Sequence, residues 1–335
     1  MRLAASLAFA AAALIGTAAQ AEDINVKLGV LSDMSSLYAD IGGPGSVVAA
    51  KMAVEDFNPA AHGIKVEIVS ADHQNKPDVG SSIARQWFDV DHVDAILDVP
   101  TSSVALAVSD VAREKNKVFL ISGAASSDLT GPKCSPNSVH WTYDTWMLAH
   151  GTGGALVKTG GDTINSIKQG AEFGITAGGQ QFAGLLVFVT DVQALGLKTA
   201  QGLVLTETWY WDMNDANRAW TKRWQAERQG KFPSMVQAGV YSATLHYLKA
   251  VAALKSAADG KAVVNQMKAI PTDDPLFGKG YIRTDGRKIH PAYLFQVKKP
   301  EESKYPGDNY TLRATIPAEE AFRPIKDDNC PMVTN

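Results

Sequence analysis

Short apolar runs alternate with helical patterns along the first part of the chain, and this alternation limits the folds open to it. The expected strands cover residues 26–31, 65–70, 95–97 and 118–121, and the expected helices between them cover residues 45–57, 79–88 and 103–114. Strands that alternate with helices in this way form a parallel sheet with helices on both faces. The sequence therefore predicts an α/β fold.

Small hydroxyl side chains follow two of these expected strands. The segment 98–103 (DVPTSS) comes directly after one strand, and the segment 120–128 (LISGAASSD) runs on from the end of the next. In an open α/β sheet, ligands bind beyond the carboxyl ends of the strands, and a helix N-terminus at that edge favours an anion. The pattern predicts a binding site for a small carboxylate at this edge of the sheet.

The N-terminus has the pattern of a secretory signal peptide. Arg2 precedes an apolar run that continues to Ile15, and the small-x-small segment 19–21 (AQA) precedes two acidic residues. We expect cleavage after Ala21, which removes residues 1–21 and yields an exported chain. The alternative, an uncleaved membrane anchor, needs about 18 or more apolar residues without such a cleavage pattern.

Composition and motifs exclude several classes of function. The chain has 335 residues and a formal net charge of −3. This length suggests two domains of roughly 150 residues each, and the weak acidic balance argues against nucleic acid and anionic membranes as partners. The Gly-rich segment 42–46 lacks the Lys-Ser/Thr of a phosphate loop, and neither H-E-x-x-H nor G-x-S-x-G occurs. We expect no cofactor, no metal and no catalytic centre.

The chain has two cysteines, Cys134 and Cys330, and both lie in loops next to proline. Disulfides form in exported proteins, and a bridge here would close a loop of about 200 residues, worth on the order of 5 kcal/mol in the chain-entropy model. The alternative is two unpaired thiols. Without a C-x-x-C pair, a zinc site made of thiolates alone is excluded.

Two aromatic segments predict crossings between lobes. The residues at 139–143 and 207–212 are aromatic and polar, without clear periodicity. Their side chains, Trp141 and Tyr143 among them, either line a ligand cleft or pack the crossings, and the sequence leaves both alternatives open. Further on, strands are expected at 183–189 and at 292–297, and the second of these follows a third crossing.

The ordered set of segments resembles one known family. The segments 26–35 (VKLGVLSDMS), 45–58, the two hydroxyl segments and 278–287 (GKGYIRTDGR), with its Asp-Gly hairpin signal, resemble the periplasmic solute-binding proteins of branched-chain amino acid ABC transporters. The resemblance implies a two-lobed type I fold, each lobe a mostly parallel sheet flanked by helices, with three hinge crossings. Lobe 1 would hold residues 22–142 and 211–289, and lobe 2 residues 143–210 and 290–335.

Seven ligand-site positions are expected: Ser102, Ser103, Ala124, Ser126, Tyr38, Tyr143 and Asp191. The resemblance carries over the serines, Ala124 and Asp191, whereas Tyr143 comes from the aromatic crossing described above. Ser102, with Ser103 beside it, matches the serine that binds the ligand carboxylate, and the carbonyl of Ala124 and the hydroxyl of Ser126 match groups that hold the ligand head group. Asp191 falls near the acidic residue that pairs with the ligand ammonium. Ile41 stands where many relatives have an aromatic residue over the ligand, with Tyr38 nearby.

The function implied is that of a non-enzymatic, monomeric periplasmic protein. It would capture a branched-chain or aromatic amino acid, or a related small carboxylate, between its lobes and present it to an ABC permease in the membrane. The alternative is a ligand sensor of the same fold that acts in signalling. A secreted hydrolase is disfavoured because the sequence shows no nucleophile and base pair.

The chain departs from the family in the length of lobe 2. Residues 146–159 run directly into the segment that begins at Gly160, where relatives have a further strand-helix-strand segment. We therefore expect a truncated lobe 2 with a join near residues 160–163. Apolar strand edges exposed there would lower solubility.

Overall fold

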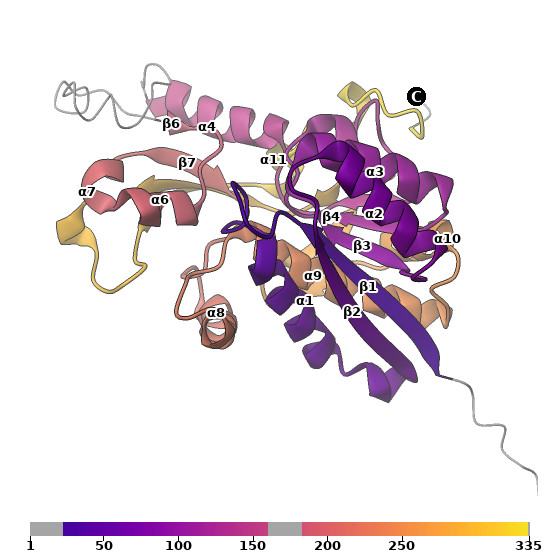
Figure 1. Cartoon of the computed structure of the whole chain (residues 1–335). Helices are drawn as coiled ribbons and strands as arrows, with labels where there is room; N and C mark the ends of the chain where they lie inside the picture. Colours follow the sequence, from indigo (N-terminus) through magenta and orange to yellow (C-terminus); the bar gives the residue numbers. More distant parts are fainter. Residues whose placement is uncertain (1–22, 160–182, 334–335) are drawn as a thin grey trace, which may run out of the picture.

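The computed structural model describes residues 23–159 and 183–333. The expected signal peptide at 1–21, its cleavage site and the expected join near 160–163 lie outside the described residues. Within the described ranges the chain forms two α/β lobes (Figure 1). No helix in these ranges has both the length and the apolar character needed to span a membrane.

Lobe 1 is built on a sheet of five parallel strands in the order β2-β1-β3-β4-β5. Its strands are β1 (Ile24–Ser32), β2 (Ile64–Asp72), β3 (Ala95–Asp98), β4 (Val118–Ile121) and β5 (Ser138–His140). The strands predicted at 26–31, 65–70, 95–97 and 118–121 are all present. Leu28 lies opposite Ile68 of β2 and Ala95 of β3.

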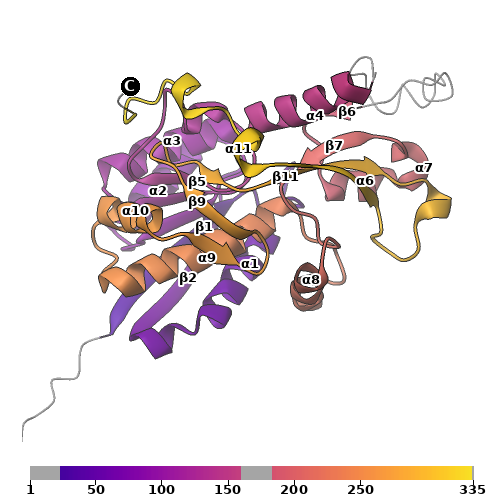
Figure 2. The ribbon, with the colours of Figure 1, turned by 180° about the vertical axis from the view of Figure 1, so that it is seen from behind.

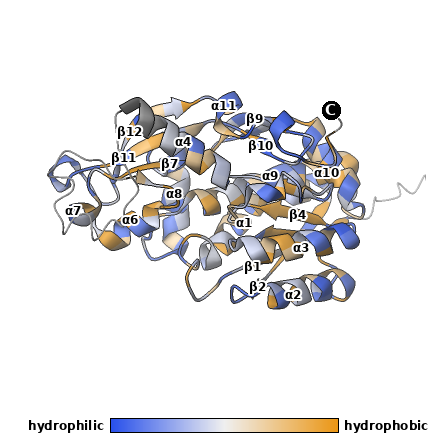
Figure 3. Cartoon of the chain, turned by 90° about the horizontal axis from the view of Figure 1, so that it is seen from above, coloured by the Kyte–Doolittle hydropathy of each residue, from blue (hydrophilic) through white to orange (hydrophobic). Residues whose placement is uncertain are grey.

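Helices cover both faces of this sheet (Figure 1). One face carries α1 (Gly43–Phe57), α9 (Met235–Leu254) and α10 (Gly260–Ala269), and the other carries α2 (Pro77–Asp89) and α3 (Ser102–Glu114). Adjacent residues on a strand point to opposite faces, so Leu97 packs with α1 and α9 whereas Ile96 packs with α2 and α3. Figure 3 shows hydrophobic colour along the strands and hydrophilic colour on outer turns such as those of α2 and α10.

Two smaller units complete lobe 1. The antiparallel sheet β8 (Thr272–Asp274), β9 (Gly278–Ile282) and β10 (Lys288–Ile289) contains the predicted Asp-Gly turn. Gly286 has φ 88°, a left-handed conformation that glycine adopts without strain. Helix α8 (Asp215–Glu227) packs beside α1, and Nε1 of Trp224 donates to the carbonyl oxygen of Gly45 at 3.1 Å.

Lobe 2 contains a mixed sheet, not the mostly parallel one that we expected. Its described strands lie in the order β12 (Tyr310–Ile316), β11 (Ala292–Val297), β7 (Val204–Glu207) and β6 (Ala183–Gly184). Only β6 and β7 are parallel, and β11 is antiparallel to both of its neighbours. Helix α4 (Thr145–Thr159) covers one face, and α6 (Val189–Leu195) and α7 (Leu197–Ala200) cover the other (Figures 1 and 2).

The C-terminal segment returns to lobe 1, although we expected it in lobe 2. After the short helix α11 (Ala318–Ala321), Nη2 of Arg323 donates to the carbonyl oxygen of Ser127 at 3.1 Å. Cys330 forms a disulfide with Cys134, the pairing expected from the sequence, with 5.7 Å between their Cα atoms. In Figure 2 the end of the described chain accordingly lies on the lobe 1 side. The described residues also contain four short 3-10 helices, at Pro59–His62, Ser127–Leu129, Pro300–Glu302 and Ile325–Asp327.

Candidate functional site

Two serine hydroxyls lie together at the carboxyl ends of β3 and β4. Ser102 is the first residue of α3, and its Oγ accepts the backbone N–H groups of Ala125 and Ser126, each at 3.2 Å. The Oγ of Ser126 accepts the N–H of Asp128 at 3.3 Å. A serine hydroxyl can donate as well as accept, and neither hydroxyl donates to a partner among the described residues, so both O–H groups are available to a ligand. Both serines are half-buried, so this pair, which we call the strand-end site, can donate to a carboxylate.

Three other residues that we expected in the site have surroundings different from those of the two serines. Ala124 is fully buried, and its carbonyl oxygen lies 2.7 Å from Nε2 of His140, so it faces the hinge. Tyr143 is buried, and its hydroxyl donates to the carbonyl oxygen of Gly123 at 2.5 Å. Ser103 is exposed on α3. In this conformation, Ala124 and Tyr143 fix the loop that carries Ser126.

Tyr38 is positioned by a polar network that sequence reasoning missed. Asp33 accepts the backbone N–H of Tyr38 at 2.8 Å and the amide of Asn75 at 2.6 Å, and Asn75 accepts from the hydroxyl of Thr101. Burial alone would raise the pKa of Asp33, but these hydrogen bonds and those from Ser36 lower it to about 2. The residues follow the ends of three adjacent strands, and that placement was the signal available in the sequence.

Asp191 belongs to lobe 2, where it is the third residue of α6. Its Oδ2 accepts the backbone N–H of Phe188 at 2.8 Å, and its side chain remains open to solvent. Although the residue is exposed, nearby protein atoms partly desolvate its carboxylate, and this desolvation raises the pKa of Asp191. The negative charge of Asp40 raises it further. The ring of Phe188 packs edge-on against Tyr143 with 5.5 Å between centroids. The loop that precedes Asp191 therefore contacts the first crossing.

The turn after β3 is backbone-strained. Asp98 and Val99 have φ values of 80° and 57°, which are uncommon for residues other than glycine. Asp98 is fully buried, its Oδ2 accepts the hydroxyl of Ser32 at 2.9 Å, and burial raises its pKa to about 6. Residues held in such conformations cost about 1–3 kcal/mol each and cluster at functional sites. The turn leads directly into Ser102.

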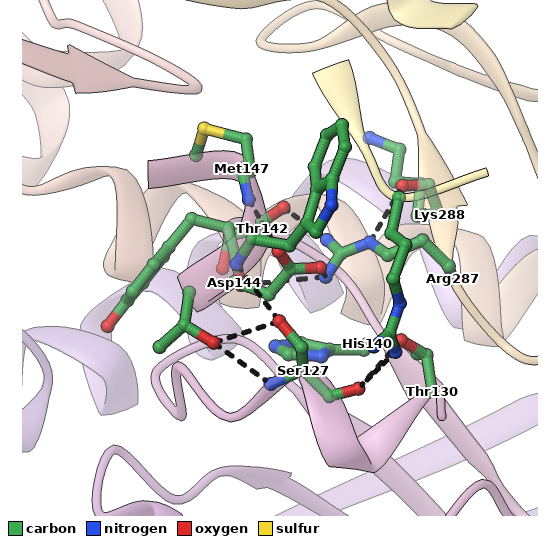
Figure 4. A network of polar contacts seen from close by, with 12 residues as sticks. Ser127, Thr130, His140, Thr142, Asp144, Met147, Arg287 and Lys288 are labelled. Carbon is green, nitrogen blue, oxygen red and sulfur yellow. Dashed lines mark hydrogen bonds and ion pairs between the residues drawn. The ribbon is translucent and has the colours of Figure 1, made fainter. Parts of the chain in front are cut away.

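One buried arginine joins the first and third crossings (Figure 4). Arg287 is fully buried; its Nη2 donates to the carbonyl oxygen of Thr142, and its Nη1 lies 3.4 Å from Oδ2 of Asp144. Its Cζ lies 4.3 Å from the centre of the Phe322 ring. Burial lowers the pKa of Arg287 to about 10, so the side chain is charged at neutral pH. The hinge and the C-terminal segment are therefore connected through this charge.

The aromatic side chains of the crossings are packed into the hinge. Trp141, Tyr143, Trp209, Tyr210 and Trp211 are all buried. Nε1 of Trp141 donates to Oγ of Ser242 at 2.8 Å, and the rings of Trp209 and Trp220 meet edge-on at 5.7 Å. The sequence left open whether these side chains line a ligand cleft or pack the crossings. In this conformation they pack the crossings.

Lys288, beside Arg287, is a buried ammonium without a hydrogen-bond partner among the described residues. Its Nζ lies 4.7 Å from the centre of the Trp141 ring and 4.2 Å from that of Phe277. Burial lowers the pKa of Lys288 from 10.5 to about 8. The two aromatic rings offset only part of the cost of removing a charge from water.

We expect Lys288→Met to raise the free energy of unfolding by about 1–3 kcal/mol near neutral pH, because it removes a buried charge and keeps the volume. Between about pH 8 and about pH 10.5, Lys288 is protonated more fully in the unfolded chain than in the folded chain, so the contribution of this group to wild-type stability rises with pH in that window. The advantage of the variant should therefore shrink as the pH approaches 10.5. Urea denaturation across this pH range measures both effects.

Lys279 offers a matched control, because it lies on the same small sheet and is exposed. Lys279→Met should change stability by no more than about 0.5 kcal/mol at any of these pH values. A Lys288→Met variant that is destabilised, or whose advantage does not vary with pH, would contradict the assignment of a costly buried charge.

The described residues contain no group of three or more His, Cys, Asp or Glu side chains that could hold a metal ion. The strand-end site has hydroxyl donors, and within residues 23–159 and 183–333 no histidine or carboxylate is hydrogen-bonded to Oγ of Ser102 or Ser126. Its chemistry is therefore that of hydrogen bonding to an anion.

Comparison with known proteins identifies relatives over most of the chain. A model of the periplasmic binding protein family matches residues 25–163 and 156–304. A periplasmic binding protein from Burkholderia mallei is 40% identical, with a TM-score of 0.86, and the match covers 92% of this chain and 99% of that chain. A branched-chain amino acid ABC transporter periplasmic ligand-binding protein from Burkholderia xenovorans is 35% identical over the same shares, with a TM-score of 0.85.

A more distant likeness concerns the fold alone. A Rhodopseudomonas palustris solute-binding protein of an ABC transporter, in complex with 4-hydroxybenzoate, is 16% identical with a TM-score of 0.77, over 89% of this chain and 98% of that chain. No match was found among curated protein sequences.

Two α/β lobes joined by three crossings, with a strand-end site on lobe 1, define a two-lobed solute-binding protein. The chain belongs to the periplasmic binding protein family, as do relatives that include a ligand-binding protein of a branched-chain amino acid ABC transporter. The resemblance and the two-lobed α/β fold predicted from the sequence are confirmed. The match to 99% of the Burkholderia mallei chain gives no sign of the truncation that we expected in lobe 2.

Proposed function

We propose that this protein captures an amino acid, or a related small carboxylate, between its two lobes for an ABC importer. The observation that carries the proposal is the pair of free O–H donors at Ser102 and Ser126, whose oxygens already accept backbone N–H groups. A carboxylate accepts two such donors in charge-assisted hydrogen bonds. Asp191, open to solvent on lobe 2, supplies a negative charge for an ammonium group.

Ligand contact with both lobes is what would drive closure. A ligand that binds the closed arrangement better than the open one shifts the population toward it, by hinge bending at the crossings. The permease in the membrane would then recognise the closed, loaded monomer. Because this role needs binding and release only, it fits a site with hydroxyl donors and no activated nucleophile.

The ligand class proposed is a branched-chain or aromatic amino acid, or an aromatic acid. In support, the Burkholderia xenovorans relative is a branched-chain amino acid transporter protein at 35% identity. The Asp191 carboxylate favours ligands that carry an ammonium group, because its negative charge at short range offsets the cost of removing water from the ammonium. We propose amino acids ahead of simple aromatic acids for this reason.

Ser102→Ala and Ser126→Ala should each weaken ligand binding by about 1–3 kcal/mol, or roughly five- to 150-fold in the dissociation constant. Each change removes a hydroxyl donor from a desolvated carboxylate. The ligand is first found by a thermal-shift screen of amino acids and aromatic acids, since a bound ligand raises apparent stability. Calorimetric titration of the mature chain then measures the affinity.

Ser82→Ala is the matched control, because Ser82 is exposed on α2 and makes no contact with the strand-end site. It should leave affinity unchanged. Unchanged affinity in both Ser102→Ala and Ser126→Ala would refute the site. Asp191→Asn separates ligand classes: it should weaken amino acids and spare acids without an ammonium group. The signalling alternative is distinguished by whether permease and ATPase genes lie beside the gene.

A further inference from the structure

A small cavity of about 130 Å³ lies between the lobes, and neither serine of the strand-end site lines it. Lobe 2 contributes Thr190 and Gln193, both on α6. Lobe 1 contributes Asp40 and, from the end of α8 and the loop after it, Arg228 and Lys231. The volume is enough for a few water molecules at about 30 Å³ each, or for one small polyatomic ion.

Three residues that line this cavity each have a polar atom without a hydrogen-bond partner among the described residues. The atoms are Nε of Arg228, Nε2 of Gln193 and Oγ1 of Thr190, and each of these atoms is buried. An unsatisfied buried donor costs about 1–3 kcal/mol, and more when it is charged. Because all three can donate, and because they come from both lobes, their common partner would be an acceptor held inside the cavity.

The charges around the cavity favour an anion. Lys231 is paired with Asp40, with 2.9 Å between Nζ and Oδ1. Arg228 forms no ion pair with any carboxylate of the described residues, and its Cζ lies 5.8 Å from the centre of the Trp224 ring. Among the residues that line the cavity, this pair cancels its own charge, so the guanidinium of Arg228 leaves one net positive charge; Asp191, which follows Thr190, is not one of the lining residues. Guanidinium is well suited to bind oxyanions through its N–H groups.

We propose that this cavity binds a small oxyanion, such as inorganic phosphate, sulfate or a short carboxylate, at a second site distinct from the strand-end site. This second site goes beyond the proposed function, because its existence does not depend on which ligand the strand-end site binds. The anion accepts from Arg228 on lobe 1 and from Gln193 and Thr190 on lobe 2, and it thereby connects the two lobes.

An anion that connects the lobes also affects ligand capture. It stabilises the arrangement in which α6 lies close to the end of α8. If the main ligand favours the same arrangement, the two bind with positive coupling, and thermodynamic linkage requires the effect to be equal in both directions. The anion would then act as an effector of closure.

The test uses the mature, disulfide-intact protein without organic ligand. Phosphate is titrated calorimetrically at constant ionic strength against chloride, and sulfate and acetate follow. Saturable binding to the wild-type protein is expected, and Arg228→Gln should weaken it by about tenfold or more, since it removes a charge-assisted hydrogen bond. Thr190→Val and Gln193→Leu provide independent variants on the other lobe, so the test stands even if one variant fails to fold.

Lys222→Gln is the matched control, because it removes the same charge from an exposed position on α8. It should leave phosphate binding unchanged. Absence of saturable binding, or equal binding by wild type, Arg228→Gln and Thr190→Val, would mean a cavity filled by water or an adventitious ion only and would overturn the proposal. Ser102→Ala should retain phosphate binding, so failure of the strand-end site and failure of this site are distinguishable.

Discussion

Replacing Cys134 and Cys330 together with Ala is expected to lower the free energy of unfolding by about 5 kcal/mol. The disulfide joins residues 196 apart in sequence, and both cysteines are buried. A cross-link over so long a loop removes many conformations from the unfolded chain, and the chain-entropy model assigns the effect to that loss. The bridge also holds the C-terminal segment on lobe 1, where Arg283 donates to Asp328 at 2.7 Å. Urea denaturation of the purified protein measures the change.

The reductant supplies the control for this prediction. Wild-type protein in reductant should lose about as much stability as the double variant, and the double variant should not respond to reductant. A difference below about 1 kcal/mol between oxidised and reduced wild type would contradict the expected contribution, because removal of a native disulfide typically costs 2–5 kcal/mol. Quantifying free thiols in the denatured, unreduced protein confirms the starting state.

Lobe 1 could be predicted from the sequence because several local signals agree there. The strand predicted at 118–121 has the same bounds in the structure, and α3 begins at Ser102, one residue before the predicted helix. Both strands that precede the hydroxyl segments are short, apolar and buried on both faces, as strands of a parallel sheet are. The helical pattern between these two strands indicates a crossover helix, which is the usual connection between parallel strands.

Lobe 2 was predicted less well, because apolar runs and strand direction are ambiguous in sequence. The run 183–189 was predicted as one strand, yet β6 ends at Gly184 and α6 begins at Val189. A short apolar run does not by periodicity alone distinguish a strand from a buried helical turn. Strand β12 was not predicted, since most of its residues are exposed. Its antiparallel pairing with β11 depends on tertiary contacts that no local pattern carries.

In the candidate site, too, some features follow from local sequence patterns and others depend on tertiary contacts. The two hydroxyl segments were predicted from their position after strands, which are present as β3 and β4, and Ser102 and Ser126 within them were predicted from the family resemblance. The network that holds Tyr38 joins Asp33 to Asn75, which are 42 residues apart, and Asn75 to Thr101, which are 26 apart. Pairings at such separations follow from the order of strands in the sheet. Likewise, only the packed structure shows that the Ala124 carbonyl is bonded to His140.

Arg287→Met is expected to lower the free energy of unfolding by about 3–5 kcal/mol. The guanidinium is fully buried between the first and third crossings, where it donates to the carbonyl oxygen of Thr142 and pairs with Asp144. Methionine fills part of the volume but leaves the Asp144 carboxylate buried without its counter-charge. An uncompensated buried charge costs far more than the pair contributes. Thermal and urea denaturation of the mature chain measure the loss.

The second substitution Asp144→Asn separates this cause from lost packing. Oδ1 of Asp144 accepts the backbone N–H of Met147 at 2.8 Å at the start of α4, and asparagine retains an oxygen for that bond. If the stranded carboxylate is the main cost, Arg287→Met with Asp144→Asn should be more stable than Arg287→Met alone. Arg313→Met, an exposed arginine on β12, should change stability by about 0.5 kcal/mol at most. A loss at Arg287 as small as that at Arg313 would show that the buried charge does not secure the hinge.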